Sequence, residues 1–234
     1  TVLLIQQNGR RLKQQQKENL MFTHQHMQTD GLPKITKLKA VVGKNVSNMQ
    51  IIVSKEDKEL LAKMASENNF DMTLNADNYL KFLTQELKPF IDKEFNVSKG
   101  QSSTFISGSS MGGLISMYAI CEYPDVFGGA ACISTHWPGT MPSDKNPIPE
   151  AFFAYMKENL PSPKDHKLYF DYGTKTLDEH YPQYAQKVNE LLKEKGYTDI
   201  NSRNLKFEGA DHSENSWNQR LNIPLTFLLG KSVE

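Results

Sequence analysis

The sequence has few of the residues that form disulfide frameworks or metal sites. Among its 234 residues are only two cysteines, Cys121 and Cys132, each in an apolar run, so we expect two buried thiols. The patterns Cys-x-x-Cys and His-Glu-x-x-His are missing, and His24 with His26 provides fewer than the three or four ligands that a metal needs. We expect no metal and no cofactor.

Long apolar runs and an excess of charge are also missing. No stretch approaches the roughly twenty apolar residues needed to cross a bilayer, so we expect no membrane span. A removed signal peptide would leave no trace, so a cytoplasmic and an exported protein both stay open. The 27 basic residues balance the 27 acidic ones, which gives no electrostatic reason to expect nucleic acid as a partner. The basic residues 10–17 are more typical of an exposed polar face.

Strand-like and helical patterns alternate along the chain, and hydrophobic residues make up 38% of it. The expected strands are residues 1–5, 48–53, 103–107, 167–172 and 204–208. This alternation is typical of an α/β protein with a mostly parallel sheet flanked by helices. We expect one domain over residues 1–234, because this length can bury a substantial core.

The most informative motif is the pentad at residues 108–112, GSSMG, which lies between a strand-like run and a helical pattern over residues 113–123. Glycines two residues before and two after a serine allow a sharp strand-to-helix turn that exposes the hydroxyl, so Ser110 is predicted as a nucleophile. Such a pentad occurs by chance in roughly one random chain of this length in ten. Support therefore has to come from an acid and a histidine that follow in order.

An acid candidate follows the expected strand at residues 167–172. Asp178 stands in the loop after that strand, where a carboxylate can orient a histidine ring and stabilise its protonated form. The competing interpretation is that Asp178 caps a helix beginning near Glu179. Asp171 and Glu179 are the reserve candidates for the acid.

The histidine candidate comes last in the chain. His212 follows the expected strand at residues 204–208 and Gly209, whose freedom lets the loop bring the ring over the carboxyl edge of the sheet. The other histidines occupy no such position, and an isolated histidine is more often an ordinary polar residue. The order serine, acid, histidine favours His212 as the general base.

Residues 73–229, which contain these three candidates, resemble the esterase D and enterochelin esterase-like family of α/β-hydrolases. Residues 1–72 diverge from that family. The matching segments are residues 79–95, 107–118, 126–137, 172–178 and 209–217. The resemblance implies an α/β-hydrolase fold, a nucleophile at Ser110, a histidine at His212 and an acid in the loop that contains Asp178.

The oxyanion hole falls partly in the divergent third. The family usually carries an oxyanion loop after an early parallel strand, and we read residues 1–5 as that strand. Backbone N–H groups can stabilise a developing oxyanion whatever side chain they carry. We therefore predict the N–H groups of Met111 and Gln7 as donors, with Gln6 or Asn8 in place of Gln7 if the register differs.

Other features of the first third also differ from the family. A capping pattern leads into a charged amphipathic helix over residues 55–68, where the family commonly has a pocket-lining loop. The antiparallel strands that normally come first in this fold are missing from the pattern, and the chain begins without methionine. We expect a processed chain, a fragment or a diverged short form.

The loop at residues 138–149 follows a strand end and is expected to border the active site. His136 and Trp137 are predicted to line the substrate pocket, and the alternative for Trp137 is a packing anchor under the loop. Residues 151–160 have an apolar face that favours a core-facing helix over a cap on the cleft.

These residues together predict a serine carboxylesterase that works through an acyl-enzyme on a small-molecule or carbohydrate-linked ester. Two alternatives stay open. The same triad serves an acyltransferase, which would hand the acyl group to another alcohol instead of water. The divergent first third instead favours an inactive α/β-hydrolase-fold binding module. The oligomeric state is left open.

Overall fold

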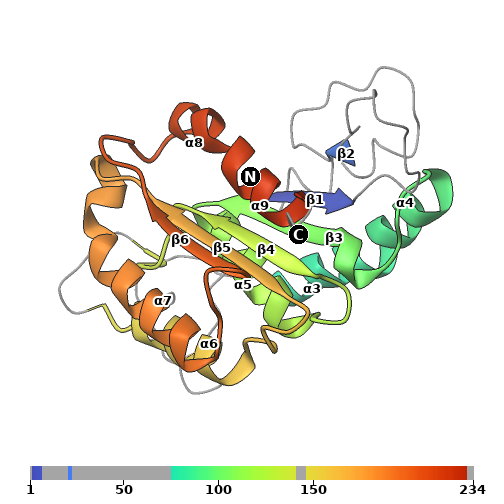
Figure 1. Cartoon of the computed structure of the whole chain (residues 1–234), viewed down its shortest axis with the longest axis horizontal. Coiled ribbons are helices and arrows are strands. Elements are labelled where there is room, and N and C mark those ends of the chain that lie inside the picture. The colour runs from blue at the N-terminus through green and yellow to red at the C-terminus, as the bar shows by residue number, and fades with distance from the viewer. Residues whose placement is uncertain (1, 7–20, 23–74, 141–145, 231–234) are drawn as a thin grey trace, which may run out of the picture.

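The computed structural model of the chain describes residues 2–6, 21–22, 75–140 and 146–230. Within these residues one six-stranded sheet has the order β2-β1-β3-β4-β5-β6 (Figure 1). The strands are β1 (Val2–Gln6), β2 (Met21–Phe22), β3 (Thr104–Ser109), β4 (Gly129–Ile133), β5 (Lys167–Tyr172) and β6 (Ser202–Lys206). The expected strand at 48–53 and helix at 55–68 lie outside the described residues.

The four strands from β3 to β6 are parallel neighbours. Phe105 pairs with Gly129, and Gly129 in turn with Lys167. Leu168 of β5 pairs with Ser202 of β6. The predicted mostly parallel sheet with flanking helices is therefore confirmed, and the carboxyl ends of these four strands share one edge.

The direction of the first strand is a correction to the sequence analysis. β1 runs antiparallel to β3, with Val2 opposite Gly108, and β2 pairs antiparallel with β1. We expected a parallel first strand and no antiparallel strands before the parallel ones. An apolar run shows which residues face the core, but either direction buries Leu4 and Ile5 equally well, so local pattern does not determine direction.

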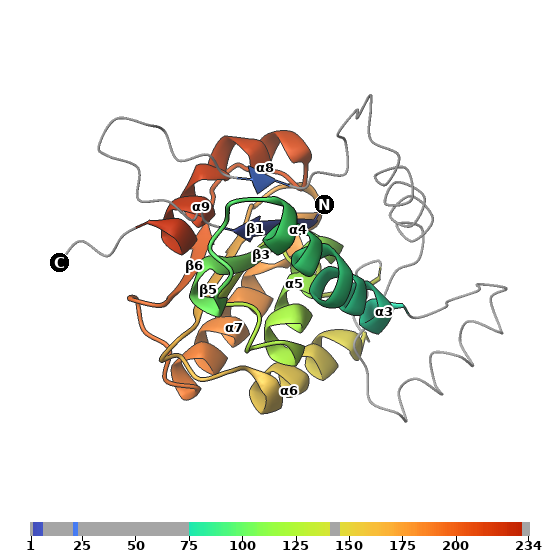
Figure 2. The ribbon, with the colours of Figure 1, turned by 90° about the vertical axis from the view of Figure 1, so that its right-hand side faces the viewer.

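Helices cover both faces of the sheet (Figure 2). They are α3 (Ala76–Lys81), the π-helical segment η1 (Phe82–Leu87), α4 (Lys88–Glu94), α5 (Met111–Glu122), α6 (Ile148–Asn159), α7 (Pro182–Glu194), α8 (Glu214–Arg220) and α9 (Asn222–Leu229). We call the side covered by α5, α6 and α7 the α5 face, and the side covered by α8 and α9 the α8 face. No helix in the described ranges combines the length and apolar character that a membrane crossing requires.

Alternation along the strands builds a separate core on each face. Ile106 and Phe170 point into the larger core, which lies on the α5 face. Phe105 and Tyr169, one residue away, point into the smaller core under α9. Within the larger core, α6 buries its apolar side, including Phe152, so the prediction of a core-facing helix is confirmed.

Both cysteines are buried free thiols in the larger core, as predicted. Cys121 lies on α5 and Cys132 on β4. Burial in apolar surroundings raises the pKa of both thiols, so neither becomes a thiolate nucleophile at neutral pH.

Candidate active site

Ser110 stands at the corner between β3 and α5 with φ 58° and ψ −121°, a strained conformation for a residue that is not glycine. The neighbouring glycines make this corner sterically feasible. A Cβ at Gly108 would lie 2.3 Å from the Gly112 carbonyl oxygen, and one at Gly113 would lie 2.7 Å from the Thr135 hydroxyl. The pentad therefore forms the sharp strand-to-helix turn that its sequence predicts.

The three predicted triad side chains form one continuous chain of hydrogen bonds. His212 Nε2 lies 2.8 Å from Ser110 Oγ, and His212 Nδ1 lies 2.5 Å from Asp178 Oδ1. Asp178 is fully buried, while the His212 side chain is 12% exposed. A buried carboxylate next to Nδ1 favours the tautomer in which Nδ1 carries the proton and Nε2 accepts from the serine hydroxyl.

The reserve candidates for the acid lie elsewhere. Asp171 pairs with Arg220, and Glu179 is exposed beside His180, so neither contacts His212. Asp178 itself lies in the 3-10 turn η3 (Thr176–His180). It caps no helix, because α7 begins only at Pro182.

Backbone bonds tie the loop that carries the acid to the loop that carries the histidine. The N–H groups of Thr174 and Lys175 both donate to the Ala210 carbonyl, at 2.9 and 3.0 Å. The His212 N–H donates to Thr176 Oγ1 at 2.9 Å. A Cβ at Gly173 would lie 2.3 Å from the Ala210 oxygen, so this close approach requires glycine. The two loops are thus held in register before any ligand binds.

A buried ionic cluster, Ser134, Asp171 and Arg220 with Tyr169, lies behind the acid. Ser134 Oγ donates to Asp178 Oδ2 at 2.6 Å and accepts from Arg220 Nη2 at 2.8 Å. Arg220 also donates to both oxygens of Asp171, at 3.0 and 3.2 Å. The Tyr169 hydroxyl donates to Asp171 at 2.9 Å.

The sequence analysis did not identify this ionic cluster as part of the site. One signal was present, because Asp171 stands inside an apolar strand where a lone carboxylate requires a buried partner. Arg220 is the last residue of α8, 49 residues further along. No local pattern connects the two.

Aromatic side chains surround the ring of His212. Trp217 packs edge-on at 5.0 Å between ring centroids, and Tyr181 packs edge-on at 5.9 Å. The ring of His136 lies at 6.3 Å. Neither Trp217 nor Tyr181 was predicted to line the site, since each stands in a segment where an aromatic residue is equally typical of core packing.

His136, which the sequence analysis placed in the substrate pocket, is buried beside His212. Its Nε2 lies 3.0 Å from the Thr140 carbonyl, which can only accept, so Nε2 carries the proton. Its Nδ1 then accepts from the Tyr181 hydroxyl at 2.8 Å. Burial, together with the nearby His212, lowers the pKa of His136 to about 4, so the ring is neutral at neutral pH.

Trp137 is a correction to the predicted pocket. Only 4% of it is exposed, and its ring packs against Phe153 at 5.0 Å and Phe170 at 6.0 Å in the larger core. The chain turns sharply after β4, so adjacent residues face opposite ways, His136 toward the site and Trp137 toward α6. The packing-anchor interpretation is the one that the structure supports.

The predicted oxyanion donors have different outcomes. Met111 is the first residue of α5, and within the described part of the chain its N–H donates to no protein acceptor. An N–H group at a helix start that has no protein acceptor is free to bind an anion. Gln7 and Asn8 lie outside the described residues.

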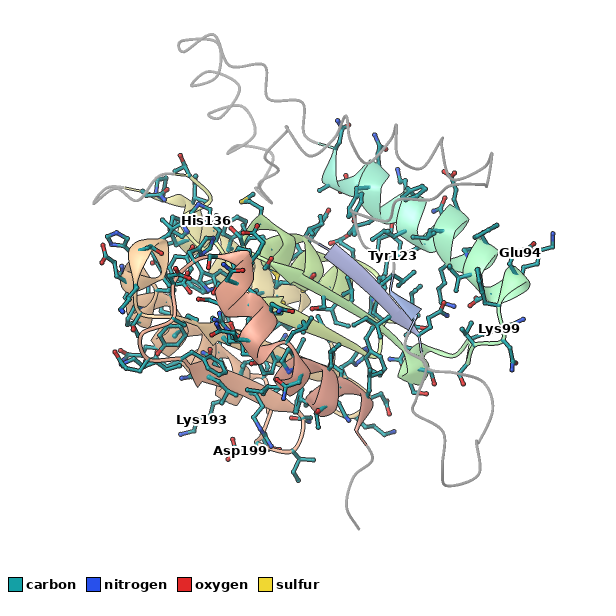
Figure 3. All side chains as sticks on the ribbon, turned by 90° about the horizontal axis from the view of Figure 1, so that it is seen from above. Glu94, Lys99, Tyr123, His136, Lys193 and Asp199 are labelled. Carbon is teal, nitrogen blue, oxygen red and sulfur yellow. The ribbon has the colours of Figure 1, made fainter. Side chains whose placement is uncertain are left out.

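Gln6 is wrong as an oxyanion donor. It pairs with Thr104 at the amino end of β3, about 20 Å of strand away from the serine corner. Its side chain donates instead to Asp92 of α4 at 2.8 Å. Figure 3 shows His136 of the site far across the molecule from Glu94 at the end of α4.

The described residues include no group of three or more His, Cys, Asp or Glu side chains arranged to hold a metal ion. The site described above is built from the protein's own hydrogen-bonding groups.

Comparison with known proteins places the chain in a family. A family model described as "Putative esterase" matches residues 31–228. The uncharacterized protein YbbA of Bacillus subtilis (strain 168) is 27% identical over 162 residues, which cover 66% of this chain and 60% of that protein. The chain thus spans about three fifths of the length of this curated relative.

Solved structures share the fold. An enterochelin esterase from Shigella flexneri matches with a TM-score of 0.52 and 19% identity, over 65% of this chain and 37% of that one. A ferulic acid esterase matches with a TM-score of 0.50 and 18% identity, over 64% of this chain and 60% of that one. The chain belongs to the putative esterase family and has the α/β-hydrolase fold, as its resemblance to the esterase D and enterochelin esterase-like family implied.

Proposed function

We propose that the protein is a serine carboxylesterase. The observation that carries this proposal is the unbroken hydrogen-bonded chain from Ser110 through His212 to Asp178, with the serine in a strained corner. Membership of the esterase family supports the same reaction class. The conjunction of a strained serine, an oriented imidazole and a buried carboxylate is the arrangement that acyl transfer requires.

The roles follow from the geometry. His212 Nε2 takes the proton of the Ser110 hydroxyl as its oxygen attacks the ester carbonyl. Collapse of the tetrahedral intermediate expels the alcohol, which receives that proton, and leaves an acyl-enzyme. His212 then activates water for the second half of the reaction, while Asp178 stabilises the imidazolium in both halves.

The oxyanion of each tetrahedral intermediate is stabilised by the Met111 N–H in this proposal. A single preorganised donor of this kind contributes roughly 3 to 4 kcal/mol of transition-state stabilisation. The second donor predicted from the sequence, Gln7, is left out of this proposal, because it directly follows Gln6, which lies at the end of β1 far from Ser110.

The substrate class that we propose is a carboxylic ester of a small molecule or a carbohydrate. Two structural neighbours carry the names ferulic acid esterase and enterochelin esterase, and both names denote enzymes that act on esters. The neutral His136 and the rings of Tyr181 and Trp217 line the histidine side of the reaction centre, which favours an uncharged ester group there.

The experiment that tests the proposal is hydrolysis of short-chain p-nitrophenyl esters together with fluorophosphonate labelling. The wild type should turn over the esters and become labelled, and Ser110→Ala should lose both. Removing the nucleophile of a triad costs on the order of 10⁶ in kcat.

The matched control is Ser109→Ala, which removes the adjacent hydroxyl of the pentad. Ser109 is buried on β3 and has no place in the proposed mechanism, so labelling and turnover should persist. A folded wild type with neither turnover nor labelling would overturn the proposal and favour the binding module. Faster product release in the presence of an added alcohol, with a new ester formed, would identify the acyltransferase instead.

A further inference from the structure

We propose that Ser134 is a positioning residue for the acid of the triad, and that Arg220 and Asp171 hold it in that role. This inference rests on the proposed function, because it explains how the carboxylate of Asp178 is kept in place for His212. It gives the buried ionic cluster a task in the reaction in addition to its place in the fold.

The two oxygens of Asp178 are divided between two tasks. Oδ1 faces His212 at 2.5 Å, and Oδ2 accepts from the Ser134 hydroxyl and the Gly173 N–H, both at 2.6 Å. A carboxylate with only one anchored oxygen can rotate about its terminal bond. The two bonds to Oδ2 therefore determine the direction in which Oδ1 presents its lone pairs to the ring.

The Ser134 hydroxyl can donate in only one direction. A serine hydroxyl has one proton, and an arginine guanidinium has donors but no acceptor. Because Arg220 Nη2 donates to Ser134 Oγ at 2.8 Å, the hydroxyl cannot return its proton to Arg220 and directs it to Asp178. Arg220 thus sets the orientation of a bond to the acid without touching the acid.

Ser134 itself is held in an unusual conformation to make this bond. It is fully buried at the end of β4 and has φ 40°, a region that residues with a side chain rarely occupy. Its N–H donates to both the backbone carbonyl and the side-chain Oδ1 of Asp171, each at 3.0 Å. Strain of this kind persists only where surrounding contacts determine it, and here those contacts come from the ionic cluster.

The charges of the ionic cluster fit the same task. The guanidinium of Arg220 is balanced by the carboxylate of Asp171, so the charge of Asp178 stays available to the imidazolium of His212. A guanidinium at the same place without its own carboxylate partner would partly neutralise the charge of Asp178 and weaken the stabilisation of the protonated His212 ring. The paired arrangement supplies a directional donor at little electrostatic cost.

The first test is Ser134→Ala, compared with Ser202→Ala as the matched control. Ser202 is a buried serine on β6 that donates to the Thr198 carbonyl and lies outside the ionic cluster. We expect Ser134→Ala to lower kcat between about 10-fold and 100-fold with KM changed less than about twofold, since tenfold corresponds to 1.36 kcal/mol of transition-state stabilisation. Ser202→Ala should leave kcat within about twofold.

A pH profile separates positioning from a general loss of packing. The titratable or charged groups that face His212 are Asp178 from η3, His136 after β4, Tyr181 after η3 and Ser110 itself. In Ser134→Ala the carboxylate has lost a donor and attracts the protonated ring more strongly, so the acid limb of kcat/KM should move to higher pH. Ser202→Ala leaves all of these groups in place and should not move it.

The second test removes the ionic pair as a unit. In Arg220→Met with Asp171→Asn no charge is left buried without a partner, so the fold should persist. The hydroxyl of Ser134 is then free to rotate, and kcat should fall as in Ser134→Ala. Adding Ser134→Ala to this double variant should lower kcat little further, because both changes disrupt the same bond.

The outcomes distinguish this inference from the proposed function. Wild-type kcat and an unmoved acid limb in folded Ser134→Ala would overturn the positioning role while the esterase proposal stands. Equal losses in Ser134→Ala and Ser202→Ala would also overturn it. A wild type without turnover or labelling would instead remove the proposed function on which the inference rests.

Discussion

The two faces of the sheet bury different kinds of side chain. The α5 face is packed mainly by aliphatic and aromatic side chains, such as Phe152, Met117 and Leu168. The α8 face has a smaller apolar core and also buries the ion pair between Asp171 and Arg220. The hydrogen bonds of this ion pair reach the acid of the triad through Ser134.

This difference shows how stability and orientation are divided. Apolar burial contributes roughly 25 cal/mol per Å² and has no preferred direction, so the α5 face stabilises the sheet without orienting any one group. A buried ion pair contributes little net stability, but its hydrogen bonds are directional. The α8 face therefore determines the angle at which the acid meets His212.

The largest expected effect concerns Asp178, the carboxylate that the α8 face orients. Asp178→Asn should lower kcat by about 10⁴-fold, because an amide facing Nδ1 favours the wrong imidazole tautomer. The ester assay measures kcat, and thermal unfolding shows whether the variant is folded. A loss below about tenfold in folded protein would contradict the role of Asp178 as the acid.

On the α5 face we expect the reverse pattern. Phe152→Ala removes a fully buried ring from α6 and should lower the free energy of unfolding by about 3 to 5 kcal/mol. The kcat of the molecules that remain folded should be unchanged. Denaturant unfolding and active-site titration with fluorophosphonate measure the two quantities.

The matched control for this prediction is Phe90→Ala on α4. Phe90 is 40% exposed, so its loss should cost much less than that of Phe152. Equal costs at the two positions would show that the α5 face is not the main apolar core.

On the α8 face, Arg220→Met alone should lower the free energy of unfolding by about 3 to 5 kcal/mol, because it leaves Asp171 buried without its cation. Adding Asp171→Asn should restore most of that stability but not kcat. The double variant should therefore be stable but slow, whereas Phe152→Ala should be less stable with an unchanged kcat. Recovery of both together would mean that the pair serves only the fold.

The smallest expected effect concerns His136, which lies between the larger core and the site. Its pKa falls from 6.5 to about 4 on folding, so at intermediate pH the unfolded chain binds a proton that the folded protein does not. The folded state should therefore lose up to about 3 kcal/mol as pH falls from 6.5 toward 4. Urea unfolding in His136→Asn should show a shallower pH dependence over this range, and an unchanged slope would contradict the shift.

Local patterns were enough for much of this molecule. Periodicity located β5 at residues 167–172 and α5 after the pentad, since both patterns depend on neighbouring residues alone. Strand β6 lies at Ser202–Lys206, two residues earlier than expected, because the polar residues at its start make no alternating pattern. Local patterns did not predict the direction of β1, which is antiparallel to β3.

Chain order was also informative about the site. Ser110, Asp178 and His212 each follow a parallel strand, and the carboxyl ends of such strands meet at one edge. This geometric rule is why three residues spread over about a hundred positions could be named together. The rule does not extend to Trp137, whose side chain direction depends on a turn that no periodicity describes.

The sequence by itself determined the positions of the strands that precede Ser110, Asp178 and His212, the serine corner and the candidates for acid and base, because each depends on local periodicity, glycine geometry or position after a strand. Only the tertiary structure brought Asp178, and not Asp171 or Glu179, to His212, since the partners of Asp178 and Asp171 lie 34 and 49 residues away in the chain. It also brought Arg220 to Ser134, 86 residues apart. A buried charge selects its partner by proximity and desolvation, and both arise only when the chain has folded.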